Sequence, residues 1–258
     1  MITVAGVVII GGSGTSGPAI PDPTGAPDGQ VVTTAGGVYG LAAPAAGGPT
    51  RTELDLSSAT GWTVDPGTGT GTAAIDTGAE TANLGGVASG VYTGNATPCI
   101  SYPIAPEEWE VRARLVTMSG GDGSARAALD VASAASGETG LSAVSVWISQ
   151  TGHVELLTAV GAGFASRGNV SAGLPLSGTG WVRIRWRDGV VSVFYGTGVG
   201  TTPPTVWRCS HVFSWAAASP TVALGHARVR MLHFGNFYGT PVSVRWADLS
   251  VVDLGAPT

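Results

Sequence analysis

The chain has 258 residues, of which only 11% are charged, and its net charge at pH 7 is −5. A hydrophobic content of 43% with so small a net charge excludes an intrinsically disordered chain, and twelve basic residues against seventeen acidic ones exclude bulk binding of nucleic acid. No apolar run approaches the roughly 18 residues that span a membrane. We therefore expect a folded protein without membrane insertion.

Residues 1–48 hold glycine- and proline-rich runs and two short apolar patches, residues 4–10 and residues 31–41. This composition cannot bury a core of its own, so the patches need another surface to cover them, most simply a neighbouring copy of the chain or a larger assembly. We predict that residues 1–48 form an anchoring and oligomerising arm that ends in a linker. Residues 49–258 then form a separate domain.

After residue 50 the sequence alternates short apolar segments with Gly, Asp, Asn or Pro. The expected strands are 52–56, 72–76, 86–92, 99–104, 110–118, 126–132, 143–149, 153–159, 181–187, 190–195, 205–212, 221–225, 228–234 and 242–253. Many short strands separated by turns are typical of an antiparallel sandwich or barrel. No window keeps the 3.6-residue period of a helix, so the fold class is all-β.

Two β-hairpins can be read directly from turn residues. Asp188 and Gly189 stand between two alternating strands, which is the strongest short-range hairpin signal. Gly152 ends a three-residue loop between residues 144–149 and 153–157, where such a loop needs a left-handed residue.

The first of these hairpins resembles a part of the concanavalin A-like lectin/glucanase jelly rolls, which include laminin-G-like modules. In those domains a Trp-led strand, an Asp-Gly turn and a strand that ends in an aromatic residue precede a further Trp. Here Trp181, the Asp188-Gly189 turn, Tyr195 and Trp207 match that order. The resemblance covers about residues 50–255 and implies an antiparallel two-sheet jelly-roll sandwich, a fold rather than a ligand.

The segment Gly-Gln-Val-Val-Thr-Thr at residues 29–34 resembles a connector that recurs in bacteriophage tail fibres and other virion appendages. That resemblance implies a trimer whose N-terminal segment binds other virion proteins and whose C-terminal head is lectin-like. We therefore expect a virion protein that is made in the host cytoplasm, displayed on the particle surface and attached to host-surface glycans. The alternative is a purely structural capsid decoration or tail subunit without a glycan ligand.

Carboxylates give little sign of catalysis. Active glucanases of this fold carry Glu-x-Asp-x-x-Glu along one strand, and the acid cluster of this chain, Glu107, Glu108 and Glu110, instead precedes a strand. We therefore predict no catalytic residue and no enzyme, which leaves a glycan depolymerase as the least favoured alternative. We also predict no cofactor, with calcium at Asp122 as a weak candidate, because laminin-G-like modules often hold calcium at a loop rim.

Arginine alternation is the most informative pattern. Three expected strands carry arginine at every second position, so their apolar residues face inward and the arginines face outward. These arginines are Arg112, Arg114, Arg183, Arg185, Arg187, Arg228 and Arg230. If the strands are neighbours in one sheet, they form a guanidinium-rich face. This face either pairs with Glu110, Glu155 and Asp248 across strands or binds an acidic glycan or a neighbouring virion subunit.

The candidate ligand-binding residues follow from that second interpretation and from one tryptophan. Trp147 shares a strand face with Ser145 and Ser149, and if that face is open its indole can stack on a sugar ring; packing within the sandwich is the alternative. The candidates are Trp147, Arg183, Arg185, Arg228 and Arg230. The sequence leaves open whether Cys99 and Cys209 form a disulfide or stay free.

Overall fold

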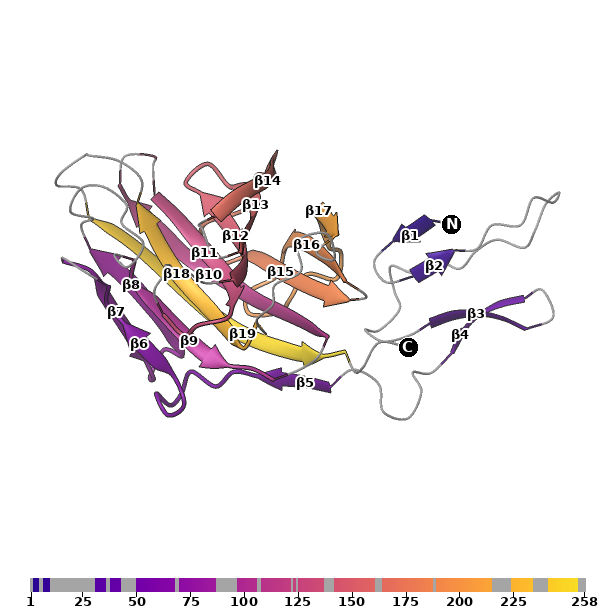
Figure 1. The fold of residues 1–258 in the computed structure, drawn as a ribbon, viewed down its shortest axis with the longest axis horizontal. Coiled ribbons are helices and arrows are strands. Elements are labelled where there is room, and N and C mark those ends of the chain that lie inside the picture. The colour runs from indigo at the N-terminus through magenta and orange to yellow at the C-terminus, as the bar shows by residue number, and fades with distance from the viewer. Residues whose placement is uncertain are drawn as a thin grey trace.

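The structure is a computed structural model that describes residues 2–4, 7–9, 31–35, 38–42, 50–67, 70–86, 97–105, 108–121, 123, 125–136, 142–160, 164–187, 189–214, 224–233 and 241–254. Before residue 50 it holds two separate two-stranded sheets, which Figure 1 shows in indigo. One pairs β1 (Ile2–Val4) with β2 (Val7–Ile9), and the other pairs β3 (Val31–Ala35) with β4 (Val38–Ala42).

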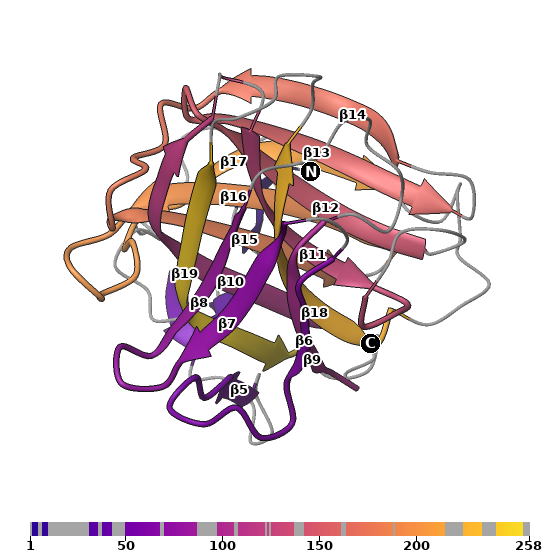
Figure 2. The same cartoon turned by 90° about the vertical axis from the view of Figure 1, so that its left-hand side faces the viewer.

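The other strands form two antiparallel sheets packed face to face (Figures 1 and 2). The eight-stranded sheet has the order β17-β16-β15-β10-β19-β8-β7, with β5 also on β19. Its strands are β5 (Thr50–Glu53), β7 (Thr72–Asp76), β8 (Thr81–Gly86), β10 (Trp109–Gly120), β15 (Gly180–Arg187), β16 (Val190–Thr197), β17 (Arg208–Ser214) and β19 (Val242–Asp253).

The seven-stranded sheet has the order β14-β13-β12-β11-β18-β9-β6. Its strands are β6 (Thr63–Asp65), β9 (Cys99–Pro103), β11 (Ala125–Ala132), β12 (Ser142–Ser149), β13 (His153–Val160), β14 (Phe164–Ser171) and β18 (His226–His233). The described residues contain no helix, and so no helix long and apolar enough to cross a membrane. The predicted all-β sandwich is confirmed.

The chain passes from one sheet to the other directly after β10, and glycine permits this crossing. Gly120 has φ +77°, a conformation that L side chains rarely adopt. A Cβ at this position would lie 1.8 Å from the carbonyl oxygen of Pro241. Gly120 therefore lets β10 and β11, which are consecutive in the sequence, enter different sheets.

The core lies between the two sheets and is built by the predicted alternation. One continuous buried cluster takes every second residue of the strands, including Val111, Ala113, Leu115, Val182, Ile184, Leu129, Val146, Leu156, Val229, Met231 and Trp246. The inward direction that the arginine pattern gave to these apolar residues in β10, β15 and β18 is confirmed. Burial of this apolar surface is the main force that holds the two sheets together.

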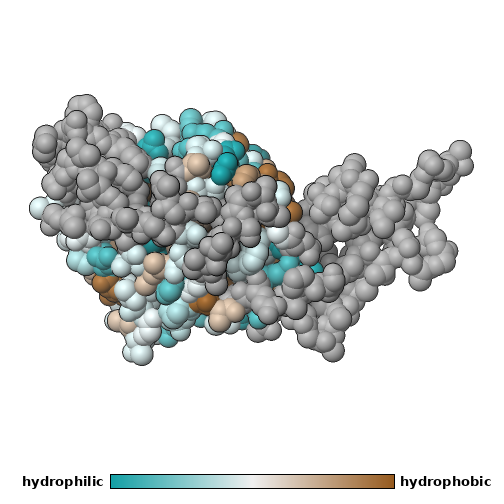
Figure 3. All heavy atoms as spheres, viewed as in Figure 1, coloured by the Kyte–Doolittle hydropathy of each residue, from teal (hydrophilic) through white to brown (hydrophobic). Residues whose placement is uncertain are grey.

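The outside of the sandwich is mixed in character. On the side shown in Figure 3 the described surface is mostly hydrophilic or neutral, with small hydrophobic patches. The exposed large hydrophobic side chains among the described residues are Val64, Val199, Val206 and Val212. Most large apolar side chains of the described strands are therefore buried, and Val64 of β6 and Val212 of β17 are exceptions.

Several predicted strand positions need correction. The strands β6 and β14 were not predicted, because β6 has three residues and β14 has no apolar alternation. The strand β8 covers Thr81–Gly86, before the strand expected at 86–92, of which residues 87–92 lie outside the described residues. The strand expected at 205–212 begins at Arg208 as β17. Of the strand expected at 221–225, residues 224 and 225 are not in a strand and the others lie outside the described residues. The Asp-Gly hairpin is confirmed, since Arg187 pairs with Val190.

The two cysteines are not bonded to each other. Cys99 is buried in β9 of the seven-stranded sheet, and Cys209 is exposed in β17 of the eight-stranded sheet. The question that the sequence left open is therefore answered in favour of two free thiols.

Candidate functional site

The arginines do not share one face. Arg112 and Arg114 lie on β10 and Arg183 on the neighbouring β15, whereas Arg228 and Arg230 lie on β18 of the other sheet. The predicted single guanidinium-rich face is therefore wrong. Alternation gives the side of a strand on which a residue lies, but not the sheet that the strand joins.

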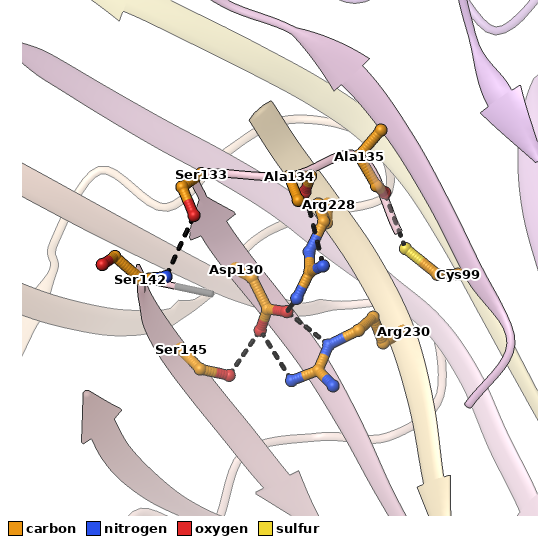
Figure 4. A network of polar contacts seen from close by, with 9 residues as sticks. All are labelled: Cys99, Asp130, Ser133, Ala134, Ala135, Ser142, Ser145, Arg228 and Arg230. Atoms are coloured by element: carbon orange, nitrogen blue, oxygen red, sulfur yellow. Dashed lines mark hydrogen bonds and ion pairs between the residues drawn. The ribbon is translucent and has the colours of Figure 1, made fainter. Parts of the chain in front are cut away.

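On the outer face of the seven-stranded sheet, Arg228 and Arg230 bind one carboxylate (Figure 4). Nη2 of Arg228 donates to Oδ2 of Asp130 at 2.9 Å, and Nη2 of Arg230 donates to Oδ1 at 3.3 Å. Nε of Arg230 also donates to Oδ2, and Oγ of Ser145 donates to Oδ1. We call Asp130, Ser145, Arg228 and Arg230 the Asp130 cluster. Its members are at most 1% exposed.

The charges of the Asp130 cluster set its ionisation. Burial by itself raises the pKa of Asp130, but the charges of Arg230 and Arg228 and the hydrogen bonds from Arg230 and Ser145 outweigh burial, so the pKa is lowered. Burial raises the pKa of the neighbouring Cys99 thiol to about 11, against the smaller opposite effect of the two arginines. Asp130 is therefore charged and Cys99 protonated at neutral pH, and a protonated thiol is a poor nucleophile. The predicted exposure of Arg228 and Arg230 is wrong.

On the outer face of the eight-stranded sheet, Glu110 pairs with two arginines of β15. Oε2 of Glu110 lies 2.6 Å from Nη2 of Arg185, and Oε1 lies 3.5 Å from Nη1 of Arg183. The Arg183 guanidinium also lies 4.3 Å from the ring centroid of Phe194 and 4.5 Å from that of Trp207. We call these five residues the Glu110 network. The predicted cross-strand pairing is thus confirmed for Glu110, and for Asp248, which accepts a hydrogen bond from Nε of Arg114.

Arg183 and Arg185 differ in their access to solvent. The side chain of Arg183 is 5% exposed and that of Arg185 is 20% exposed. The predicted open position of Arg183 is therefore wrong, because the aromatic rings of Phe194 and Trp207 cover its guanidinium. A role of either arginine in ligand binding remains a prediction.

Trp147 lies on the outer face of β12, opposite Ala128 of β11 and Glu155 of β13. Only 8% of the residue is exposed, because its indole packs with Ala128, Leu157 and Leu232 in a small cluster outside the main core. The predicted direction of this side chain is confirmed. The prediction that its face is open is wrong. The alternative prediction, that the indole packs against other side chains of the sandwich, is confirmed.

The side chains around Trp147 are more accessible than the indole itself. Arg126, His153 and Glu155 are half-buried, and Asn169 of β14, which lies opposite Glu155, is exposed. We call Arg126, Trp147, His153, Glu155 and Asn169 the Trp147 surface. Within the described part of the chain, Glu155 has no hydrogen bond and no ion pair, so its carboxylate can accept hydrogen bonds from a ligand.

From the sequence we predicted Glu155 only as a cross-strand partner for arginine. Among the described residues it forms no ion pair with an arginine, so that prediction is wrong for Glu155. A signal for its position was present. The predicted hairpin with Gly152 in its loop sets Ser149 opposite His153, and counting back two residues on each strand sets Trp147 opposite Glu155. The hairpin alone therefore brings an indole and a carboxylate together.

No metal site is found within the described ranges, where no group of three or more His, Cys, Asp or Glu side chains could hold an ion. Asp122, the predicted calcium carboxylate, lies outside the described residues. Calcium therefore remains a prediction.

Comparison with known proteins identifies the fold. No protein-family model and no curated protein sequence matches the chain. Similar solved structures include a Bacillus licheniformis β-glucanase, with a TM-score of 0.51, 10% identity and coverage of 80% of this chain and 98% of that one. The fold is that of the concanavalin A-like lectins and glucanases.

Two proteins solved with a bound sugar have similar scores. A winged bean acidic lectin, solved with methyl-α-D-galactose, has a TM-score of 0.50 and 10% identity and covers 80% of this chain and all of its own. The exoplasmic/lumenal domain of VIP36, in a form bound to Ca²⁺ and Man3GlcNAc, has a TM-score of 0.50 and 8% identity and covers 80% of this chain and 89% of its own. At such identities the likeness shows the fold alone.

The prediction that the chain is not an enzyme is overturned. A glucanase is among the structures that share this fold over 80% of the chain. The fold is therefore one on which glycan-cleaving activity occurs, although the likeness transfers no catalytic residue to this sequence.

Proposed function

We propose that the sandwich binds a glycan at the Trp147 surface. The observation that carries this proposal is the position of Glu155, a half-buried carboxylate directly opposite Trp147 that has no hydrogen bond or ion pair among the described residues. A carboxylate accepts hydrogen bonds from neighbouring sugar hydroxyls. Trp147, of which 8% is exposed, limits the apolar contact beside it to a small area, so the hydrogen bonds to Glu155 supply most of the recognition.

The surroundings favour a preformed site. Trp147 is held by Ala128, Leu157 and Leu232 on a sheet rather than on a loop, so little order has to be gained when a ligand binds. Asn169, exposed and opposite Glu155, adds an amide that both donates and accepts hydrogen bonds. The sugar complexes of the winged bean lectin and of VIP36 support the choice of ligand class, since both proteins share this fold.

The test is a glycan array probed with the full chain and three variants. We expect Glu155→Gln and Glu155→Ala to weaken binding at least tenfold, because a hydrogen bond to a charged acceptor contributes about 1.5–3 kcal/mol. The matched control is Glu80→Gln, which changes an exposed carboxylate in the turn between β7 and β8 and should bind like the unchanged chain. Equal binding by the Glu155 variants would contradict the proposed site. Binding of no glycan would favour the structural alternative.

The fold also calls for a measurement of activity on the same samples. Each bound glycan is incubated with the full chain, and released reducing ends are quantified. Release that Glu155→Gln abolishes would extend the proposed function from binding to cleavage at this surface.

We further propose that residues 1–48 attach this sandwich to a bacteriophage particle, as part of a tail fibre, spike or decoration. The support is the Gly-Gln-Val-Val-Thr-Thr segment together with the pairing of β3 and β4 into a sheet of only two strands. Because an isolated hairpin is at best marginally stable in water, it needs a further surface. A trimer formed there would convert weak single-site binding into tight attachment.

Light scattering tests whether residues 1–48 hold the oligomer together. We expect the full chain to have the mass of a trimer and a chain without residues 1–48 to have the mass of a monomer. A truncated chain that keeps the larger mass would move the oligomer contact to the sandwich.

A further inference from the structure

The arginines that first favoured an acidic glycan are already paired with acidic side chains. Each of the seven has a carboxylate partner: Arg112 has Glu53, Arg114 has Asp248, Arg183 and Arg185 have Glu110, Arg187 has Glu108, and Arg228 and Arg230 have Asp130. Each guanidinium is therefore already engaged within the fold, with Glu110 and Asp130 each shared by two arginines. An anionic ligand would have to compete with these carboxylates, most of which are buried.

The charge closest to Trp147 on its own face is negative. Glu155 lies directly opposite the indole, one strand away. Arg230 lies three strands from β13, about 14 Å at the usual spacing of about 4.8 Å between strands, and is bound to Asp130. A ligand seated between Trp147 and Asn169 therefore meets the carboxylate of Glu155 first.

Two further arginines, Arg126 of this surface and Arg167 of β14, make contacts within the fold. Arg126 lies two strands away and two residues along, about 12 Å from Glu155 by strand geometry, and its Nη1 donates to the carbonyl oxygens of Gly123 and Ala125 at 3.0 and 2.8 Å. Nε of Arg167 donates to Oγ1 of Thr158 at 2.7 Å, and its guanidinium lies over Phe213 of the other sheet.

The charge of Glu155 also acts on His211, which lies on β17 of the eight-stranded sheet. Burial lowers the pKa of His211 from its ordinary value, an effect larger than the rise that the Glu155 charge causes. The imidazole is therefore neutral at pH 7 and adds no positive charge to the site.

The geometry points to an uncharged glycan as the ligand of the Trp147 surface, in place of the acidic glycan that the arginine pattern favoured. This inference rests on the proposed glycan binding. A neutral sugar donates hydroxyl hydrogens to Glu155, whereas a uronate, sialate, sulfate or phosphate group at the same place meets the like charge of Glu155 at close range. Arg126, the arginine of this surface, lies farther from that place, about 12 Å from Glu155 by strand geometry. Like charges in contact oppose binding most strongly at low salt.

The test compares matched glycans on one array with the full chain. Each backbone is presented in an uncharged and an acidic form, such as galactan with polygalacturonate and dextran with dextran sulfate. At low ionic strength we expect every acidic form to bind at least tenfold more weakly than its uncharged partner, and we expect the difference to shrink at high salt. Glu155→Gln should reduce the difference between the two forms, because it removes the like charge and keeps the shape.

The variant Arg126→Gln tests the opposite outcome, in which acidic glycans bind more tightly than uncharged ones. If acidic glycans bind better and Arg126→Gln removes that preference, Arg126 rather than Glu155 sets the ligand charge and the inference is wrong. Preferential binding of acidic forms with both variants unchanged also overturns it. Binding of no glycan in either form overturns the proposed function itself, which separates the two failures. Circular dichroism of each variant verifies that the sandwich is folded.

Discussion

Two carboxylates on the same outer face of the seven-stranded sheet have opposite environments. Asp130 on β11 is fully buried and accepts hydrogen bonds from Ser145, Arg228 and Arg230. Glu155 on β13, with only β12 between, is half-buried and has no such partner among the described residues. A charge removed from water must be paired within the protein, whereas a charge that water still reaches can remain available to a ligand. The comparison separates a carboxylate that stabilises the fold from one suited to recognition.

The largest expected effect comes from Asp130→Asn. The substitution leaves Arg228 and Arg230 buried without their carboxylate, so we expect the free energy of unfolding to fall by about 3–5 kcal/mol. Urea denaturation followed by tryptophan fluorescence measures it. If Asp130→Asn unfolds at the same urea concentration as the unchanged chain, the Asp130 cluster does not stabilise the sandwich and the contrast with Glu155 fails.

The same carboxylate predicts a dependence of stability on pH. Because the pKa of Asp130 is lowered in the folded state, its contribution is fully present above the unfolded value of about 3.9 and is lost as the pH falls from there through the folded value. We expect the stability difference between the unchanged chain and Asp130→Asn to be constant between pH 7 and 5 and to shrink below about pH 4. Urea titrations across this range measure it, and a difference at pH 2 as large as that at pH 7 would contradict the pairing.

A smaller loss is expected for Glu110→Gln on the other sheet. Arg185 reaches water, and Arg183 keeps its contacts with Phe194 and Trp207, so we expect a loss of about 1–3 kcal/mol. Combining it with Trp207→Ala sharpens the result. If the two losses simply add, the carboxylate and the indole hold Arg183 independently; a coupling of at least about 0.5 kcal/mol shows that they act together.

The smallest effect on stability is expected for Glu155→Gln. Since this carboxylate has no partner among the described residues, we expect the free energy of unfolding to change by no more than about 0.5 kcal/mol. The same variant should lose glycan binding, which distinguishes it from Asp130→Asn. A large loss of stability in urea denaturation would show that Glu155 stabilises the fold and would remove the difference between the two carboxylates.

Local pattern was enough to predict the fold class and part of the site. Period-two alternation placed Val111, Ile184 and Val229 inward and their arginine neighbours outward. The hairpin that contains Gly152 also held the register that sets Trp147 opposite Glu155, although Glu155 was predicted only as a partner for arginine. Both results depend on residues close together in the sequence. By contrast, β14 was missed because an edge strand with exposed polar residues needs no apolar alternation.

The sequence by itself determined the all-β class, the direction of each side chain within its strand and the two hairpins, because these follow from the geometry of a single strand and its turn. Only the tertiary structure decided that β18 joins a different sheet from β10 and β15, that Asp130 meets an arginine 98 residues away, and that Trp147 is covered. Sheet membership, ion pairing and burial depend on contacts between distant segments, and those contacts decide which charges balance one another and which stay open to a ligand.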